Sequence, residues 1–275
     1  MEIGQQPMMQ LQETKIGLGK NLLIKLGHNS VSLILSMPDG TLTNHLYKEF
    51  SKKIETHLLE NKLDSIISES NFTKQNITNV KLIVCNRLSS IVPKNLFEEK
   101  FSLEYLKYNA KLLKNDFAAN DKIEEIGAIN VYIPFVNVNN YLIEKFGAFN
   151  YYHYSTILIK KLIKIANLKK TSFFVNIQLD SIQILIFKNK KLQLYNNFEI
   201  KEKEDIIYFL LLSIEQNKID NKKTKISLHG IIKNDTYLLL EKFISNLEII
   251  DLSKKKAKIT GLNNSIKIDY LIIWE

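Results

Sequence analysis

Three short apolar runs separated by turn residues decide the fold: Asn21-Leu-Leu-Ile-Lys-Leu26, Val31-Ser-Leu-Ile-Leu35 and residues 41–47. Each run has the length and the β-branched content of a strand, and the connections suit tight turns. The same plan returns at residues 173–177, 182–187 and 192–198. A plan that occurs twice predicts duplication, with two similar α/β lobes facing each other across a cleft.

Each group of three strands is followed by a helix, a strand and another helix. Apolar spacing predicts helices at 51–68, 101–113, 137–146, 155–167, 205–216 and 234–245. Further strands are expected at 79–85, 129–133, 225–229, 247–252 and 266–274, with residues 90–97 turning the chain. The expected organisation is a flexible N-terminus (1–14), a first lobe (15–150), a connecting helix (151–170) and a second lobe (171–275).

The composition indicates a globular protein. The chain has 275 residues, 45% of them apolar, and few glycines or prolines, which leaves little room for long flexible linkers. Cys85 is the single cysteine and ends an apolar run, so a buried strand thiol is expected rather than a disulfide or a metal motif. No apolar stretch has the length of a membrane span, and the first residues do not form a leader, so a cytoplasmic location is expected.

The formal net charge of +9 raises the question of nucleic-acid binding. Arg87 is the only arginine. A nucleic-acid-binding protein would be expected to have more, because arginine makes bidentate hydrogen bonds to phosphate and guanine. Lysine, isoleucine and asparagine share A/T-rich codons, and all three are abundant here. Solvated lysine faces are therefore the expected explanation, and nucleic-acid binding is kept as a lower-ranked alternative.

An aromatic cluster precedes the connecting helix. It contains Tyr151, Tyr152 and Tyr154, with His153 among them. Such rings pack well at the joint between two lobes, and exposed tyrosines supply much of the energy at protein interfaces. These three tyrosines are the expected contacts for a protein partner.

Two strand meanders with crossover helices, joined by a helix, resemble the actin, sugar-kinase and heat-shock-protein ATPase superfamily. More narrowly, the chain resembles a bacterial family known as a domain of unknown function, number 3822. The residues that carry this likeness are 92–97 (Val-Pro-Lys-Asn-Leu-Phe), 105–109, 130–133, the His153 stretch, 204–210 with 215–216, and 229–234 (His-Gly-Ile-Ile-Lys-Asn). The resemblance implies two ribonuclease-H-like lobes in an actin-like ATPase arrangement.

The resemblance also implies where a nucleotide would bind. In active members, acidic glycine-rich turns between the first two strands of each lobe hold Mg²⁺ and phosphate, and a later paired glycine approaches the adenosine. The corresponding positions here are Gly27, Asn29 and Ser30 in the first turn, Asp180 and Ser181 in the second, and Gly230 for the paired glycine. The first turn lacks an acid, the second lacks a glycine, and one of the paired glycines is missing. A degenerate cleft is expected, with no cofactor, although ATP with Mg²⁺ is a possible ligand.

Other chemistry has no support in the sequence. The five histidines do not form HxH or HExxH, and GxSxG and GxxxxGK[ST] are absent. No catalytic residue and no metal ligand is therefore assigned. The favoured interpretation is a non-catalytic, actin-like scaffold for an unknown protein partner. A nucleotide-dependent ATPase or kinase-like enzyme using the cleft is the first alternative, and a nucleic-acid-associated protein is the second.

Overall fold

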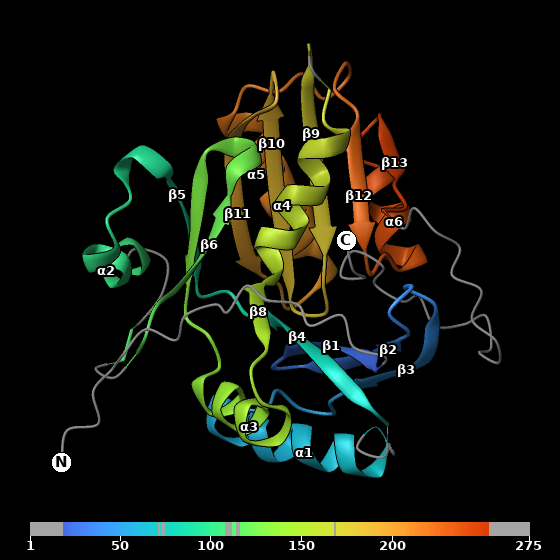
Figure 1. Ribbon diagram of the computed structural model, residues 1–275. Coiled ribbons are helices and arrows are strands. Elements are labelled where there is room, and N and C mark those ends of the chain that lie inside the picture. Colours follow the sequence, from blue (N-terminus) through green and yellow to red (C-terminus); the bar gives the residue numbers. More distant parts are fainter. Residues whose placement is uncertain are drawn as a thin grey trace.

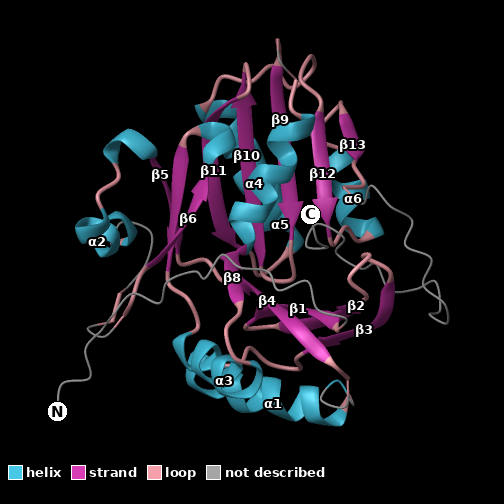
Figure 2. Cartoon of the chain, in the orientation of Figure 1, coloured by secondary structure: helices cyan, strands magenta, loops and turns pink. Residues whose placement is uncertain are grey.

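The computed structural model describes residues 19–252, except 71, 73–74, 108–111, 114–115 and 168. Two five-stranded sheets lie one above the other, and a smaller three-stranded sheet stands beside them (Figure 1, Figure 2). The expected segments 1–14 and 266–274, and the basic segment 253–258, lie outside the described residues.

The first sheet has the strand order β3-β2-β1-β4-β8. Its strands are β1 (Lys20–Gly27), β2 (Ser30–Ser36), β3 (Leu42–Glu49), β4 (Ile77–Cys85) and β8 (Asn150–His153). Helices α1 (Leu59–Glu69) and α3 (Val136–Phe146) lie beneath it in Figure 1. Alternate residues of β1 and β2, such as Leu22, Ile24 and Leu33, are fully buried and form one core with these helices.

The second sheet has the order β11-β10-β9-β12-β13. Its strands are β9 (Thr171–Ile177), β10 (Ser181–Lys188), β11 (Lys191–Glu199), β12 (Ile226–Gly230) and β13 (Leu247–Ile249). Helices α5 (Lys203–Gln216) and α6 (Asn234–Glu241) cover one face of this sheet and share a core with it.

The two sheets have the same topology. In each, the first three strands pair antiparallel, and the next two strands add in parallel on the other side of the first. The predicted duplicated α/β architecture is therefore confirmed.

Helix α4 (Tyr154–Ile165) joins the lobes. Figure 1 shows it lying across the second sheet, directly after the edge strand β8 of the first. Leu158, Ile159 and Leu162 of this helix share one buried cluster with Ile34 of the first sheet and Phe187 of the second. The helix therefore packs against both lobes.

The third sheet was not expected from the sequence. Strands β5 (Ser89–Pro93), β7 (Ala128–Tyr132) and β6 (Ala119–Ile123) pair antiparallel, with β7 in the middle. The prediction of a turn at residues 90–97 was wrong over its first part, because Ser89–Pro93 forms a strand. Pro93 is compatible with this strand, because β5 is an edge strand and a proline is tolerated there.

Two helix boundaries also differ from the prediction. The helix expected at 51–68 begins only at Leu59, after the 3₁₀ turn Thr56–Leu58, so Ile54 packs from a loop. The helix expected at 101–113 is the short α2 (Ser102–Leu106), which follows the 3₁₀ turn Glu99–Phe101. In the segment 51–68, Ile54 is half-buried although its backbone is not an α-helix. In the segment 101–113, the structure describes only residues 101–107 and 112–113.

Candidate functional site

A cavity of about 740 Å³ lies between the two lobes. All six residues expected at a nucleotide site line it: Gly27, Asn29, Ser30, Asp180, Ser181 and Gly230. The topology explains this meeting, because the β1–β2 turn, the β9–β10 turn and the end of β12 occupy corresponding edges of two similar sheets. The details of each turn decide what the cavity can hold.

The first turn, between β1 and β2, is held by hydrogen bonds to the loop that follows β3. The carbonyl oxygen of Asn29 accepts from the Phe50 amide at 2.8 Å, and that of His28 accepts from the Ile54 amide at 2.8 Å. The His28 ring donates from Nδ1 to the Ile54 carbonyl oxygen at 2.7 Å. Burial lowers the pKa of His28. The ring is therefore a neutral, structural group that holds the turn against its neighbour.

Gly27 has a packing role in the same turn. A Cβ at this position would lie 3.1 Å from the carbonyl oxygen of Cys85 on β4. The glycine lets β1 and β4 approach each other at this edge of the sheet. Cys85 itself is half-buried and lines the cavity.

The second turn is a tight connection between β9 and β10. The Gln178 amide donates to the Ser181 carbonyl oxygen at 2.8 Å, and the Asp180 carbonyl oxygen accepts from the Ile200 amide at 2.9 Å. A phosphate-binding turn needs its amides directed at the ligand. Here the amide at the start of the turn is already used to close the hairpin.

The side chain of Gln178 bridges the two lobes. Its Nε2 donates to Asn176 Oδ1 at 3.1 Å and to the Tyr154 hydroxyl at 3.3 Å. Lys25 of the first sheet donates to Gln178 Oε1 at 3.4 Å, and its ammonium lies 4.4 Å from the centroid of the Tyr154 ring. A polar network on the cavity lining thus connects the first lobe, helix α4 and the second lobe.

Gly230 also has a structural explanation. Its φ is +93°, and a Cβ would lie 2.1 Å from the Ile177 carbonyl oxygen on β9. That carbonyl oxygen accepts from the Ile231 amide at 2.8 Å. Close contact between β12 and β9 therefore requires the glycine.

The charges that line the cavity are balanced in number. Lys25, Lys53 and Arg87 are the lysine and arginine side chains, and Glu49, Asp180 and Asp251 are the carboxylates. Arg87 is paired with Glu199 of β11 at 2.8 Å. Within the described residues, no three histidine, cysteine or acidic side chains are grouped so that they could hold a metal ion.

A buried serine–histidine pair on the cavity wall was missed by sequence reasoning. Ser32 Oγ lies 3.0 Å from His45 Nε2, and both residues are buried. Burial lowers the pKa of His45, and its Nδ1 has no hydrogen-bond partner in the part of the chain that the structure describes. Without a group that orients the imidazole, the pair lacks the third member of a nucleophilic triad. The two residues are 13 positions apart and meet only through the β2–β3 register.

A second buried network, around Asp121 of β6, was also missed. Its carboxylate accepts from the His153 amide at 2.8 Å, from Thr156 Oγ1 at 2.7 Å and from the Tyr132 hydroxyl at 3.2 Å. Burial raises the pKa of Asp121 to about 6, and burial lowers that of His153 to about 4. Asp121 is one of three acids in the stretch 120–125, and no sequence pattern distinguishes it from Glu124 and Glu125.

The three tyrosines expected to contact a partner lie at the joint between the lobes. Tyr151 is 7% exposed and belongs to the core of the first lobe, and Tyr154 is 3% exposed and packs between the lobes. Tyr152 is half-buried and packs against the same inter-lobe cluster. A partner would reach little of Tyr151 or Tyr154, so only Tyr152 keeps appreciable surface for such a contact.

The chain matches a known protein family over most of its length. The model of a family described as "Protein of unknown function (DUF3822)" matches residues 11–247. The chain belongs to this family. The expected membership is confirmed, whereas no curated protein matches the chain.

Two solved structures are similar in fold to this DUF3822 chain. A Bacteroides thetaiotaomicron protein with an actin-like ATPase fold and unknown function is 23% identical, with a TM-score of 0.72, and the match covers 85% of this chain and 91% of that one. The PilM–PilN type IV pilus biogenesis complex contains a chain that is 12% identical, with a TM-score of 0.58, over 86% and 89%. At these identities the comparison establishes the actin-like ATPase fold and nothing about activity.

Proposed function

We propose that this chain is a protein-interaction module, a pseudo-ATPase that keeps the actin-like fold without efficient turnover of ATP. The observation that carries the proposal is the closure of the second phosphate turn, in which the Gln178 amide donates to the Ser181 carbonyl oxygen. The corresponding turn of an active relative would direct its amides at phosphate.

The rest of the cleft fits Mg²⁺-nucleotide poorly for three reasons. The first turn carries no carboxylate, so Asp180 is the only acid in the two turns. The network through Lys25, Gln178 and Tyr154 connects the two lobes along the cavity lining. The close approach of the Ile177 carbonyl oxygen requires a glycine at position 230. Strand packing therefore explains this glycine without a role in binding adenosine.

The retained fold argues for a role that uses surfaces rather than the cleft chemistry. The buried positions are filled with apolar side chains in both lobes and at the joint. The fold resembles that of a chain in the PilM–PilN type IV pilus biogenesis complex, a protein assembly. This support is an analogy from fold. None of the helices within the described residues combines the length and apolar character needed to cross a bilayer.

Titration of the full chain with Mg-ATP by calorimetry, followed by a phosphate-release assay, tests the proposal. We expect no saturable heat at micromolar protein and no release above buffer. The Asp180→Ala variant is the matched control, because Asp180 is the only acid in the two turns. Turnover that disappears in this variant would make the enzyme alternative correct.

Binding of a small polar ligand in the cleft is the second candidate function. The cavity volume of about 740 Å³ suits a small molecule, and the imidazole of His45 is part of its polar lining. Mass spectrometry of the purified protein under native conditions distinguishes the two functions. A small molecule retained by the wild-type chain and lost in His45→Phe would favour this candidate.

A further inference from the structure

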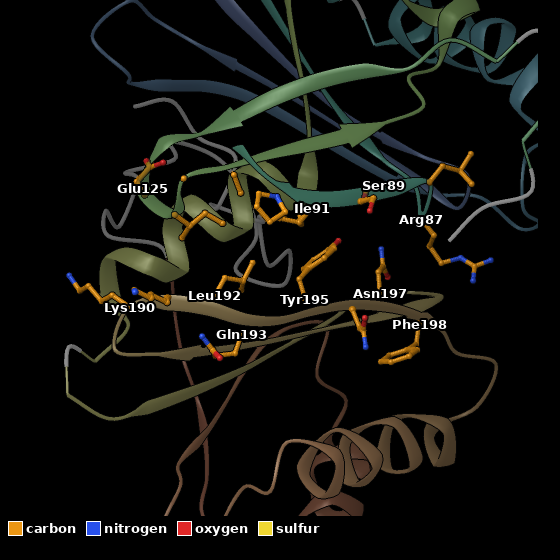
Figure 3. A pocket seen from close by; sticks show the side chains of 18 residues that line it. Arg87, Ser89, Ile91, Glu125, Lys190, Leu192, Gln193, Tyr195, Asn197 and Phe198 are labelled. Atoms are coloured by element: carbon orange, nitrogen blue, oxygen red, sulfur yellow. The ribbon is translucent and has the colours of Figure 1, made fainter. Parts of the chain in front are cut away.

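A second cavity, of about 1160 Å³, lies between two sheet edges on another side of the molecule. Figure 3 shows Ser89 and Ile91 of β5 on one side of this groove and Leu192, Tyr195 and Asn197 of β11 on the other. The labelled residues run in opposite order along the two strands, so β5 and β11 are antiparallel across the groove (Figure 3). Both are end strands in the order of their own sheets.

The hydrogen-bond register directs alternate main-chain groups of β11 toward the open edge of its sheet, which borders the groove. The Ile200 amide donates to the Asp180 carbonyl oxygen, which makes this a hydrogen-bonded pair of the antiparallel ladder. Because such pairs alternate along the strands, residues 198 and 196 face β10. Tyr195 and Asn197 then direct their own main-chain N–H and C=O groups away from β10.

The same reasoning applies to β5. The Ile133 amide donates to the Leu88 carbonyl oxygen at 3.0 Å, and the Lys94 amide donates to the Gly127 carbonyl oxygen at 2.8 Å. Alternation between these pairs leaves Ser89 and Ile91 with main-chain groups directed away from β7. Within the described residues, no main-chain hydrogen bond between β5 and β11 closes the gap.

Polar side chains form one cluster on the groove wall. Tyr195 of β11 is hydrogen-bonded to Ser89 and Asn197, and also to Ser155 and Gln183. Ser89 is 5% exposed, so this cluster is satisfied within the chain. An occupant would therefore pair with main-chain groups of the two strands rather than with these side chains.

The charged side chains that line the groove indicate which kind of ligand it favours. The groove is lined by Arg87, Lys190 and Lys191 against a single acid, Glu125. Arg87 is neutralised by Glu199 at 2.8 Å. Lys190 lies in the β10–β11 turn, where Asn189 and Lys190 both have positive φ, as in the tight turns that favour hairpins, and Lys191 begins β11. Figure 3 places Glu125 at the same end of the groove as Lys190. Two lysines against one acid leave that end with a net positive charge, which complements an acidic ligand.

We propose that the groove binds an extended peptide segment of a partner protein, which pairs through its main chain with β5 and β11. An acidic side chain of the segment lies against Lys190 and Lys191. Addition of a strand to an exposed sheet edge is a general mode of peptide recognition. A strand residue occupies about 160 Å³, the product of a rise of about 3.3 Å, a strand spacing of about 4.8 Å and a sheet spacing of about 10 Å. The cavity of about 1160 Å³ therefore has room for a segment of about seven residues. The proposal deepens the proposed protein-interaction role and rests on it.

Fluorescence anisotropy with labelled octapeptides tests this. The probes alternate threonine and valine and carry two aspartates at either the N-terminal or the C-terminal end, with lysine-ended counterparts. We expect one aspartate form to bind, the lysine forms to bind about tenfold more weakly, and methylation of alternate peptide nitrogens to abolish binding, because it removes the main-chain donors.

Variants of the full chain localise the binding. Lys190→Glu with Lys191→Glu should reverse the charge preference, whereas Lys222→Glu with Lys223→Glu, in the connection before β12, should not. Ile91→Pro removes a donor that faces the groove and leaves the β7 ladder in place, so it should weaken binding at least fivefold relative to Ile91→Ala. Thermal unfolding of both variants verifies that they are folded.

Several outcomes would overturn the proposal. They are the absence of binding by every probe, equal binding of the aspartate and lysine forms, and retained binding of the methylated peptide. Slow hydrogen exchange of the Ile91 and Tyr195 amides without peptide would mean that the groove is already filled: by the chain itself if the protection is independent of concentration, by a second copy if it grows with concentration. A negative peptide result leaves the nucleotide titration untouched, so the two proposals fail independently.

Discussion

Replacement of Asp121 by asparagine is expected to stabilise the protein increasingly as the pH rises from 4 to 7. Asp121 is 3% exposed and accepts three hydrogen bonds, from the His153 amide, Thr156 and Tyr132. These donors favour the ionised carboxylate, but burial is the larger effect and raises the pKa from 3.8 to about 6. An asparagine side chain has nearly the same shape, and its oxygen can keep the bonds from His153 and Thr156.

The size of the effect follows from the difference between the folded and unfolded pKa. From 3.8 to about 6 is about 2 units, and at about 1.4 kcal/mol per unit the buried charge costs about 3 kcal/mol. Between these two pH values the folded chain holds a proton that the unfolded chain has lost. The free energy of unfolding contributed by Asp121 therefore falls as the pH rises and reaches its full loss above about 6. The variant has no such proton, so its advantage grows from near zero to about 3 kcal/mol.

Urea unfolding followed by circular dichroism at four pH values between 4.5 and 7.5 measures this difference. His153, whose pKa is lowered to about 4, acts in the opposite direction, because its contribution to stability grows as the pH rises to about 6.5. It is present in both proteins and cancels in the comparison. Asp39→Asn is the control: Asp39 is exposed and accepts from the Thr41 amide at 2.8 Å, which lowers its pKa. A difference between Asp121→Asn and wild type that stays flat or shrinks with pH would refute the reasoning.

Two further substitutions test the packing of the cleft and of the joint. Gly230→Ala places a Cβ 2.1 Å from a main-chain oxygen at φ +93°, so the free energy of unfolding in urea should fall by about 2–4 kcal/mol. Gly127→Ala is the control, because Gly127 also has positive φ but a Cβ there meets open space; it should lose only about 1 kcal/mol. Equal losses in the two variants would contradict the steric argument. Leu162→Ala, 1% exposed between the lobes, should lose about 2–5 kcal/mol, against less than about 1 kcal/mol for Ile165→Ala, which is 44% exposed. Separate unfolding of the two lobes in calorimetry of the wild type would show that the joint does not couple them.

Much of the fold could be predicted because its signals are local. In β1, β2, β9 and β10, runs of apolar residues between tight turns indicate strands without any knowledge of their neighbours. In the third sheet, only β7 gave such a signal, at residues 129–133. Strand β5 of this sheet is five residues long and contains two serines and a proline, a composition equally typical of a turn. Pairing with β7, about 40 residues away, makes it a strand.

The sequence by itself determined the duplicated architecture and the positions of the two turns that line the inter-lobe cavity, because strand periodicity and turn residues act over a few neighbouring positions. Only the tertiary structure decided what those turns can do. Whether the Gln178 amide faces a ligand or the Ser181 carbonyl oxygen depends on turn geometry, and whether Gly230 serves a ligand or Ile177 depends on how β12 meets β9. The Ser32–His45 pair and the groove between β5 and β11 likewise arise from strand register, which joins residues far apart in the chain. Packing of the two sheets supplies that information, and no local pattern carries it.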